Sequence, residues 1–255
     1  MSDGPRILTL DIETSPAKVY VFDLWNQNIG INQVIEPTRV ISFAAKWVGS
    51  PRVMFFSEFH SGADLQSGRE EMIASAYGLL DQADAVVTYN GDRFDLPHLN
   101  REFAEFGLGR PAPYHSIDLF KTVKKNQRWL SNKLAWVTER LELGGKLETG
   151  GFELWRSCLE GDPKAWAKMR RYNKQDVVTT EELYIELLPW IDSHPTFQLY
   201  VDDASLEPKC PRCNSTDIQK RGYTTTKVSK FQRYQCQTCG VWSRGGKRLA
   251  GVDLR

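Results

Sequence analysis

Two apolar segments that each run into acidic residues constrain the fold of this chain more than any other feature. The segment 7–10 leads into Asp11 and Glu13, and the segment 85–88 is followed by an Asn-Gly turn and then by Asp95. Side chains alternate along a strand, so Asp11 and Glu13 should lie on the same face of a sheet. Carboxylates that converge at strand ends repel one another unless divalent cations neutralise them. The pattern therefore predicts an α/β sheet whose strand ends hold metal ions.

A third acidic position lies in the long stretch 163–189, which is expected to be helical. Asp176 follows Tyr172 at the i, i+4 spacing, so a helix places the phenol and the carboxylate on one side. Two cations about 4 Å apart form the usual clamp for in-line displacement at phosphorus. The four acidic residues together therefore predict a metal-dependent nuclease.

Each acidic patch alone has a simpler structural interpretation. Asp11 and Glu13 could be exposed acids of an edge strand, and Asp95 could cap a helix, a role for which Asp92 competes. Asp176 could be an exposed acid beside a core tyrosine. The apolar flanks and the joint occurrence of all three patches favour the metal site.

The near-zero net charge hides an uneven distribution. The chain has 255 residues, 41% of them apolar, and a formal net charge of +1. Residues 205–255 hold 11 basic and 3 acidic residues, a net charge of +8, which leaves −7 for residues 1–204. This asymmetry predicts metal chemistry in the acidic part and polyanion contact in the basic part.

Membrane and secretion signals are absent from the sequence. It contains no run of 18 apolar residues and no apolar N-terminal stretch typical of a signal peptide. We therefore expect no membrane segment and a cytoplasmic protein. In that compartment the five cysteines are interpreted as metal ligands plus one spare thiol.

The order of the expected elements predicts an α/β sheet followed by a helical half. Strands are expected at 6–13, 19–24, 40–48, 53–56, 85–89 and 115–119, and helices at 69–82, 96–106, 131–142 (with Ser131 as N-cap), 151–159 and 163–189. The segment 192–208 contains two prolines and is interpreted as a linker. The expected organisation is a catalytic domain at 1–191, this linker, and a small domain at 209–255.

The three acidic patches, in this order, resemble the DEDD superfamily of 3′-to-5′ exonucleases. That superfamily has a D-x-E motif (Asp11 and Glu13 here), an N-x-x-x-F-D motif (Asn90, Phe94 and Asp95) and, in its tyrosine subclass, a Y-x-x-x-D motif (Tyr172 and Asp176). The chain is also similar to a ribonuclease H-like exonuclease family of bacteria and phages. This similarity is carried by two short sequence segments, Thr88-Tyr89-Asn90-Gly91 and His115-Ser116-Ile117-Asp118-Leu119. The resemblance covers about residues 6–190 and implies a ribonuclease H-like mixed sheet flanked by helices.

The resemblance also implies roles for the individual side chains. Asp11 would bridge two Mg²⁺ or Mn²⁺ ions, Glu13 and Asp176 would bind the ion that activates water, and Asp95 would help to hold the other ion. Tyr172 would orient the attacking water, because tyrosine is a weak base near neutral pH. Three neighbours of these residues are expected to contact nucleic acid: Thr14, Asn90 and Phe94. The implied setting is a bacterial cell or a phage-infected host.

Four cysteines near the C-terminus have the spacing of a structural zinc site. Cys210 and Cys213 form one C-x2-C pair, and Cys236 and Cys239 form a second. Four thiolates around one Zn²⁺ leave no open coordination position, so this site should be structural. A redox role for these pairs is the less favoured alternative. Cys158 has no partner in the sequence and is interpreted as a buried thiol.

The segment around these cysteines resembles the zinc ribbons of some transposases and other DNA-handling proteins. Two hairpin strands are expected at 218–223 and 228–235, and the predicted nucleic-acid contacts are Lys220, Arg221, Lys230 and Arg233. The alternative is that the ribbon binds a protein partner or packs on the catalytic domain.

The sequence as a whole favours a 3′-to-5′ exonuclease with two Mg²⁺ or Mn²⁺ ions and one Zn²⁺, acting on nucleic acid, most simply DNA with a free 3′ end. Three alternatives stay open at this point. A structure-specific endonuclease could use the same fold. A transposase-like enzyme would usually end its acidic set with glutamate, whereas this set ends with Asp176. A catalytically inactive nucleic-acid-binding module is disfavoured by the complete acidic set.

Overall fold

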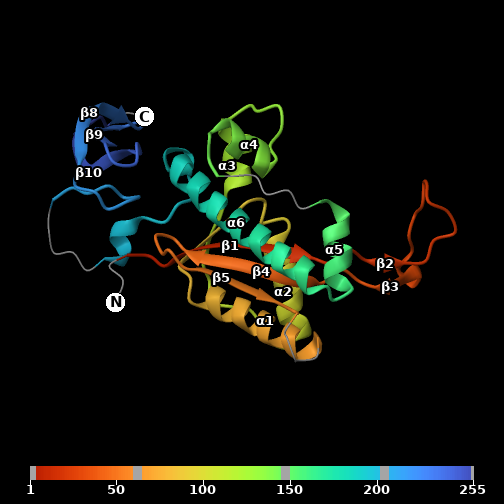
Figure 1. Ribbon diagram of the computed structural model, residues 1–255. Helices are drawn as coiled ribbons and strands as arrows, with labels where there is room; N and C mark the ends of the chain where they lie inside the picture. The colour runs from red at the N-terminus through yellow and green to blue at the C-terminus, as the bar shows by residue number, and fades with distance from the viewer. Residues whose placement is uncertain (1–3, 60–64, 145–149, 202–206, 254–255) are drawn as a thin grey trace.

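The computed structural model describes residues 4–59, 65–144, 150–201 and 207–253 (Figure 1). A five-stranded mixed sheet lies at its centre, with the strand order β5-β4-β1-β6-β7. The strands are β1 (Ile7–Thr14), β4 (Val40–Trp47), β5 (Val53–Ser57), β6 (Ala85–Thr88) and β7 (His115–Asp118). β1 pairs antiparallel with β4 and parallel with β6, and β6 pairs parallel with β7. The carboxyl ends of β1, β6 and β7 therefore meet at one edge of the sheet.

Helices cover both faces of this sheet (Figure 1). On one face lie α1 (Leu65–Asp81) and α2 (Asp95–Glu105), and on the other lies the long α6 (Pro163–Leu187). The remaining helices are α3 (Leu119–Asn126), α4 (Leu134–Arg140) and α5 (Phe152–Leu159). Among the described residues, no helix combines the length and the apolar character needed to cross a membrane.

The alternation of β1 determines which of its residues reach α6. Leu8, Leu10 and Ile12 are buried in the core formed with α1 and α2. Ile7, one residue out of step with them, belongs to the core on the α6 side. The same period of two places Asp11 and Glu13 on the α6 side. The face of β1 that carries Leu8, Leu10 and Ile12 is thus buried against α1 and α2. The opposite face, which carries Asp11 and Glu13, is turned toward α6.

The loop between β6 and α2 is fixed by close backbone contacts. Asn90 has a φ of +66°, a left-handed conformation that asparagine tolerates better than most residues. Its backbone N–H donates to Asp118 Oδ1 at 2.8 Å, and Asp118 also accepts from the backbone N–H of Phe120, at the start of α3, at 3.0 Å. Asp118 therefore ties the loops after β6 and β7 together.

The C-terminal segment forms a separate antiparallel sheet of three strands (Figure 1). These are β8 (Ile218–Thr225), β9 (Ser229–Cys236) and β10 (Trp242–Gly251), with β9 in the middle. The chain reaches this sheet through two short 3₁₀ helices, Leu188–Trp190 and Phe197–Tyr200. The backbone N–H of Phe197 donates to the carbonyl of Pro211, and Arg212 Nη2 donates to the carbonyl of Asp192 at 3.4 Å. The start of the ribbon thus contacts the segment that follows α6.

The expected strand at 19–24 is wrong. Only Lys18–Val19 (β2) is extended there, and it pairs with Val34–Glu36 (β3), which the sequence did not reveal. A 3₁₀ helix at Ile31–Gln33 precedes β3. Residues 20–24 are apolar enough for a strand, but the structure offers them no strand partner, and Phe22 and Leu24 are almost fully exposed. Strand propensity reflects the packing of side chains against neighbouring strands, and in the described part of the chain residues 20–24 have no neighbouring strand to pack against.

Most of the other expected elements are confirmed within a few residues. The exceptions are α3 and β10, which were not expected, and the cap of α4. Ser131 accepts a bond from the backbone N–H of Lys133, but the helix cap is Lys133 itself, without a side-chain cap bond.

Replacing Gly91 should destabilise the fold, because a Cβ there would lie 2.3 Å from Thr88 Oγ1 and 2.4 Å from Thr88 Cβ. Thr88 is fully buried in β6, so it has little room to move. We expect Gly91→Ala to lower the free energy of unfolding by about 1–3 kcal/mol. The matched control is Gly78→Ala in α1, where a Cβ meets nothing within 4 Å. It should stabilise the protein by about 1 kcal/mol. Denaturant unfolding of both variants measures the difference, and equal effects would contradict it.

Candidate metal centres

Three carboxylates gather where β1 passes beneath α6. Asp11 and Glu13 come from β1 and Asp176 comes from α6, and one carboxylate oxygen of each lies within 4.8 Å of the other two. Ligands of one octahedral Mg²⁺, with metal–oxygen distances near 2.1 Å, lie about 3–4 Å apart. The three oxygens therefore fit the shared coordination of a hard divalent cation with small adjustments.

Asn173 fixes the carboxylate of Asp11. Its Nδ2 donates to Asp11 Oδ2 at 2.6 Å and to the backbone carbonyl of Asp11 at 3.2 Å. Its Oδ1 accepts from the hydroxyl of Ser42 in β4 at 3.4 Å. Asn173 is fully buried. One amide thus joins α6 to β1 and β4 and sets the position of Asp11.

Aromatic side chains hold the other two carboxylates. The side chain of Trp155, in α5, forms a hydrogen bond with Glu13 that lowers the pKa of that carboxyl. The hydroxyl of Tyr172 bonds the carboxylate of Asp176 in the same way. Trp155 and Tyr172 themselves meet edge to face, with ring centroids 6.3 Å apart. The expectation that Tyr172 and Asp176 face the same way is met.

Asp95 stands slightly apart from this group. It begins α2, its side chain is almost fully buried, and its Oδ1 accepts the backbone N–H of Ile12 at 3.1 Å. It is not among the three residues whose oxygens lie within 4.8 Å of one another. Its charge nevertheless raises the pKa of Asp11. Asp95 therefore lies close enough to Asp11 for its charge to act on that carboxyl, next to the group of three carboxylates.

The electrostatics of the four carboxylates indicate a need for cations. Burial is the largest cause that raises the pKa of Asp11, Glu13, Asp95 and Asp176 above the ordinary values. Repulsion from Asp95, Glu13 and Asp176 raises the pKa of Asp11 further. The opposing contributions come from hydrogen bonds, such as that of Asn173. A divalent cation would supply the positive charge that such a cluster requires.

The expected nucleic-acid contacts of the catalytic part lie around the same edge of the sheet. Thr14 directly follows Glu13 at a register shift of β1, and Asn90 lies in the loop after β6. Phe94 is 39% exposed, and its ring meets that of His98 at 4.8 Å. A hollow of about 450 Å³ lies beside Asn90, lined also by Tyr89, Phe120, Asn132, Lys133 and Leu134.

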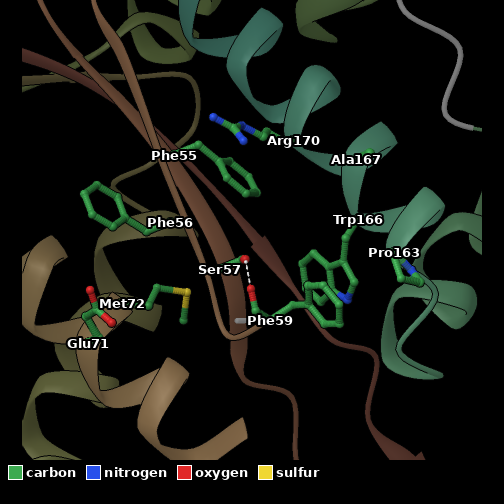
Figure 2. Close-up of a pocket in the computed structure, with 10 residues that line it drawn as sticks. All are labelled: Phe55, Phe56, Ser57, Phe59, Glu71, Met72, Pro163, Trp166, Ala167 and Arg170. Carbon is green, nitrogen blue, oxygen red and sulfur yellow. Dashed lines mark hydrogen bonds between the residues drawn. The ribbon is translucent and has the colours of Figure 1, made fainter. Parts of the chain in front are cut away.

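A second hollow has no link to the acidic residues. It has a volume of about 390 Å³ and lies where the edge strand β5 meets α1 and α6 (Figure 2). Its lining is mostly apolar and includes four aromatic side chains, with Phe59 stacked on Trp166 at 5.6 Å. None of the predicted site residues lines it. The carboxylate cluster is thus separate from this apolar hollow.

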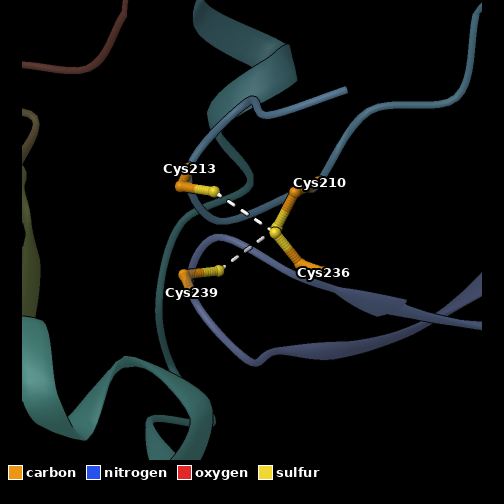
Figure 3. Close-up of side chains that lie close together, drawn as sticks. All are labelled: Cys210, Cys213, Cys236 and Cys239. Atoms are coloured by element: carbon orange, nitrogen blue, oxygen red, sulfur yellow. Dashed lines mark hydrogen bonds between the residues drawn. The ribbon is translucent and has the colours of Figure 1, made fainter. Parts of the chain in front are cut away.

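The four cysteines form a second, chemically different site. Their sulfur atoms all lie within 4.8 Å of one another (Figure 3). Cys210 Sγ lies 3.5 Å from Cys239 Sγ, and Cys213 Sγ lies 3.6 Å from Cys236 Sγ. Four thiolates bound to one tetrahedral Zn²⁺ at 2.3 Å lie about 3.8 Å apart. The cluster therefore fits zinc, and Cys158 is buried elsewhere, between α5 and α6.

Two residues that hold the carboxylates were missed as site residues in the sequence. Trp155 belongs to no motif in the sequence, because its contact with Glu13 depends on how α5 packs beside β1. Asn173 lies next to Tyr172, and the motif spacing alone gave it no role. The signal available in the sequence was that Asn173 is a polar residue next to Tyr172 in an expected helix, at a position that the helix must bury.

The family of the chain follows from its sequence. Residues 30–188 match a family model, RNase_H_2, described as the RNase_H superfamily. Because this match covers more than half of the chain, the protein belongs to the ribonuclease H superfamily. The matched range includes Asp95, Tyr172 and Asp176 and begins after Asp11 and Glu13. This match and the five-stranded sheet confirm the predicted ribonuclease H-like mixed sheet, and the three-stranded sheet with its four-cysteine cluster agrees with the predicted small C-terminal ribbon.

The chain is similar to parts of two DNA polymerases. A DNA polymerase of Methanocaldococcus jannaschii is 25% identical over 172 residues, which make up 66% of this chain and 9% of the polymerase. The structure of a family B DNA polymerase from the hyperthermophilic archaeon Pyrobaculum calidifontis matches with a TM-score of 0.47 and 20% identity. That match covers 72% of this chain and 25% of the polymerase. The chain thus spans only a small part of either protein.

Removing the amide of Asn173 should weaken both the fold and the site. In Asn173→Ala the carboxylate of Asp11 and the hydroxyl of Ser42 lose the hydrogen bonds that they form with Asn173, which should cost about 2–4 kcal/mol of stability. Loss of a residue that orients a metal ligand should also slow any metal-dependent cleavage by about 10–100-fold. The matched control is Asn100→Ala, at an exposed position of α2, which should change neither quantity. A fully active Asn173→Ala variant would contradict the positioning role.

The purified protein should contain one equivalent of zinc. Replacing Cys210 and Cys213 by Ser should remove that zinc and unfold the ribbon, because such sites gain their folding energy from the metal. Cys158→Ser is the matched control and should keep the full equivalent. Elemental analysis after dialysis measures the content. Zinc retained by the Cys210/Cys213 variant would contradict the assignment.

Proposed function

We propose that this protein is a 3′-to-5′ exonuclease that hydrolyses DNA with two Mg²⁺ or Mn²⁺ ions. One observation carries the proposal: the carboxylates of Asp11, Glu13 and Asp176 share one site, with the hydroxyl of Tyr172 on the carboxylate of Asp176. Membership of the ribonuclease H superfamily supports a nuclease-type function. The 3′-to-5′ direction rests on the resemblance of the three motifs to the DEDD exonucleases.

The proposed roles follow from where each side chain lies. Bound divalent cations would stabilise charge on the reacting phosphate and lower the pKa of water. The charges of Asp95, Glu13 and Asp176 all act on Asp11, which suits a residue shared by two ions. Tyr172 would hold the attacking water in line, since burial raises the pKa of its phenol above the ordinary value near 10 and the protonated hydroxyl is a poor base at neutral pH.

The choice of DNA as substrate rests on two observations. The curated relative that matches 66% of this chain is a DNA polymerase. The ribbon carries a net charge of +8 within residues 205–255, which suits contact with a polyanion. We propose that residues 1–191 cleave, that residues 209–255 bind one structural Zn²⁺ and grip the nucleic acid, and that 192–208 connect them. The cytoplasm remains the expected location.

A direct test uses 5′-labelled single-stranded and double-stranded DNA and RNA, together with circular DNA, in Mg²⁺ or Mn²⁺. A product ladder that shortens from the 3′ end is expected, and it should stop when the divalent metal is chelated. Cutting of circular DNA would instead indicate an endonuclease. No cleavage of any substrate would indicate an inactive binding module.

The two central site residues should respond differently to substitution. Asp11→Asn should nearly abolish cleavage while the protein stays folded, because asparagine keeps the shape but not the charge. Tyr172→Phe should slow single-turnover cleavage by about 10–1,000-fold, in the range expected for a positioning group. Wild-type rates for Asp11→Asn would end the assignment of the site, and an unchanged Tyr172→Phe rate would make Tyr172 a packing residue.

A further inference from the structure

The two faces of the ribbon sheet carry different basic residues. Alternation along the central strand β9 puts Phe231 and Arg233 on one face and Lys230 and Tyr234 on the other. Across the strand pairs, Arg244 lies opposite Arg233 and Arg248 lies opposite Phe231, whereas Lys220 lies opposite Tyr234. We call the first set, with Trp242, the arginine face, and the second set the lysine face.

The arginine face holds two guanidinium–ring pairs. The Cζ of Arg233 lies 4.7 Å from the ring centroid of Trp242, and the Cζ of Arg244 lies 4.4 Å from that of Phe231. The Nε of Arg233 also donates to the carbonyl of Arg221 at 2.9 Å. These contacts hold long side chains in one orientation, so binding a ligand would cost less conformational entropy.

The charges of this face are available to a ligand. Arg233, Arg244 and Arg248 are exposed, as is Trp242, at 48%. Within the part of the chain that the structure describes, no acidic side chain forms an ion pair with any of the three arginines. Unpaired cations beside aromatic rings suit a ligand that is both anionic and planar.

We infer that the arginine face is the surface through which the ribbon binds single-stranded nucleic acid. This inference rests on the proposed nucleic-acid role of the ribbon. Planar guanidinium groups contact phosphate with two parallel bonds, and unpaired bases stack on guanidinium planes and aromatic rings. A duplex keeps its bases stacked on each other, so it would use only the charge of this face.

The lysine face provides the matched comparison. It carries Lys220 and Lys230, with the Nζ of Lys230 4.0 Å from the ring centroid of Tyr223. Lysine is a point charge without a stacking plane. This face should therefore add general attraction to a polyanion and little else. The predicted contacts Lys220 and Lys230 are thus separated from Arg233 by the sheet itself.

The experiment compares two double variants that each remove two positive charges from the full-length chain. Arg233→Gln/Arg244→Gln changes the arginine face, and Lys220→Gln/Lys230→Gln changes the lysine face. Both are made in an Asp11→Asn background, so that the substrate stays intact during measurement. Binding of labelled single-stranded and duplex DNA oligonucleotides is followed over a salt series. Retention of one zinc equivalent confirms that each ribbon is folded.

The arginine-face variant should bind single-stranded DNA about 10–100-fold more weakly, and the lysine-face variant less than about 3-fold. The slope of log affinity against log salt should become shallower by about 1.4 in the first, for two lost phosphate contacts. Arg233→Lys/Arg244→Lys keeps the charge but not the planes, and it should recover only part of the affinity. Full recovery would overturn the stacking part of the inference.

Other outcomes separate this inference from the proposed role of the ribbon. Equal losses on the two faces, or a larger loss for duplex than for single strands, would overturn the inference and leave the ribbon as a general nucleic-acid contact. The Cys210→Ser/Cys213→Ser variant serves as the reference for a disrupted ribbon. If that variant binds as well as the parent, the nucleic-acid role of the ribbon fails, and a protein partner becomes the better explanation.

Discussion

The burial of four neighbouring acidic side chains is the constraint on which the rest of this structure depends. Asp11, Glu13 and Asp176 lie close enough to share a cation, and the nearby charge of Asp95 also acts on Asp11. Burial raises the pKa of all four carboxyls, and like charge within the cluster raises the pKa of Asp11 and Glu13 further, so the bare cluster opposes folding at neutral pH. The two apolar cores around the sheet must outweigh this cost, and divalent cations would remove much of it.

Strand pairing and a buried hydrogen bond hold the acidic side chains together despite this cost. Parallel pairing of β1 with β6 brings the D-x-E segment and the loop before Asp95 to one edge of the sheet. The buried amide of Asn173 then joins α6 to Asp11 at that edge, which places Tyr172 and Asp176 on the side of β1 that carries Asp11 and Glu13. The ribbon offers four thiolates in place of carboxylates; sulfur ligands favour zinc, and carboxylates favour Mg²⁺ or Mn²⁺.

Local periodicity explains how much of this could be predicted from the sequence. The period of two placed Asp11 and Glu13 together, the i, i+4 spacing paired Tyr172 with Asp176, and the C-x2-C pairs defined the four-cysteine cluster. Contacts between distant segments gave no such signal, which is why Trp155 and Asn173 were missed. Residues 20–24 misled the strand prediction because apolar composition does not reveal whether a partner strand exists. The division of the ribbon into two faces required the strand register.

The central claim is that the carboxylate cluster binds divalent cations. Calorimetric titration of Mn²⁺ into the zinc-loaded protein, compared with Asp11→Asn/Glu13→Gln, tests it most directly, because the readout is binding and not activity. The wild type should bind up to two Mn²⁺ ions, and the variant should lose measurable binding at the same concentrations while keeping its zinc. Mn²⁺ binding of equal affinity and stoichiometry in the two proteins would contradict the claim.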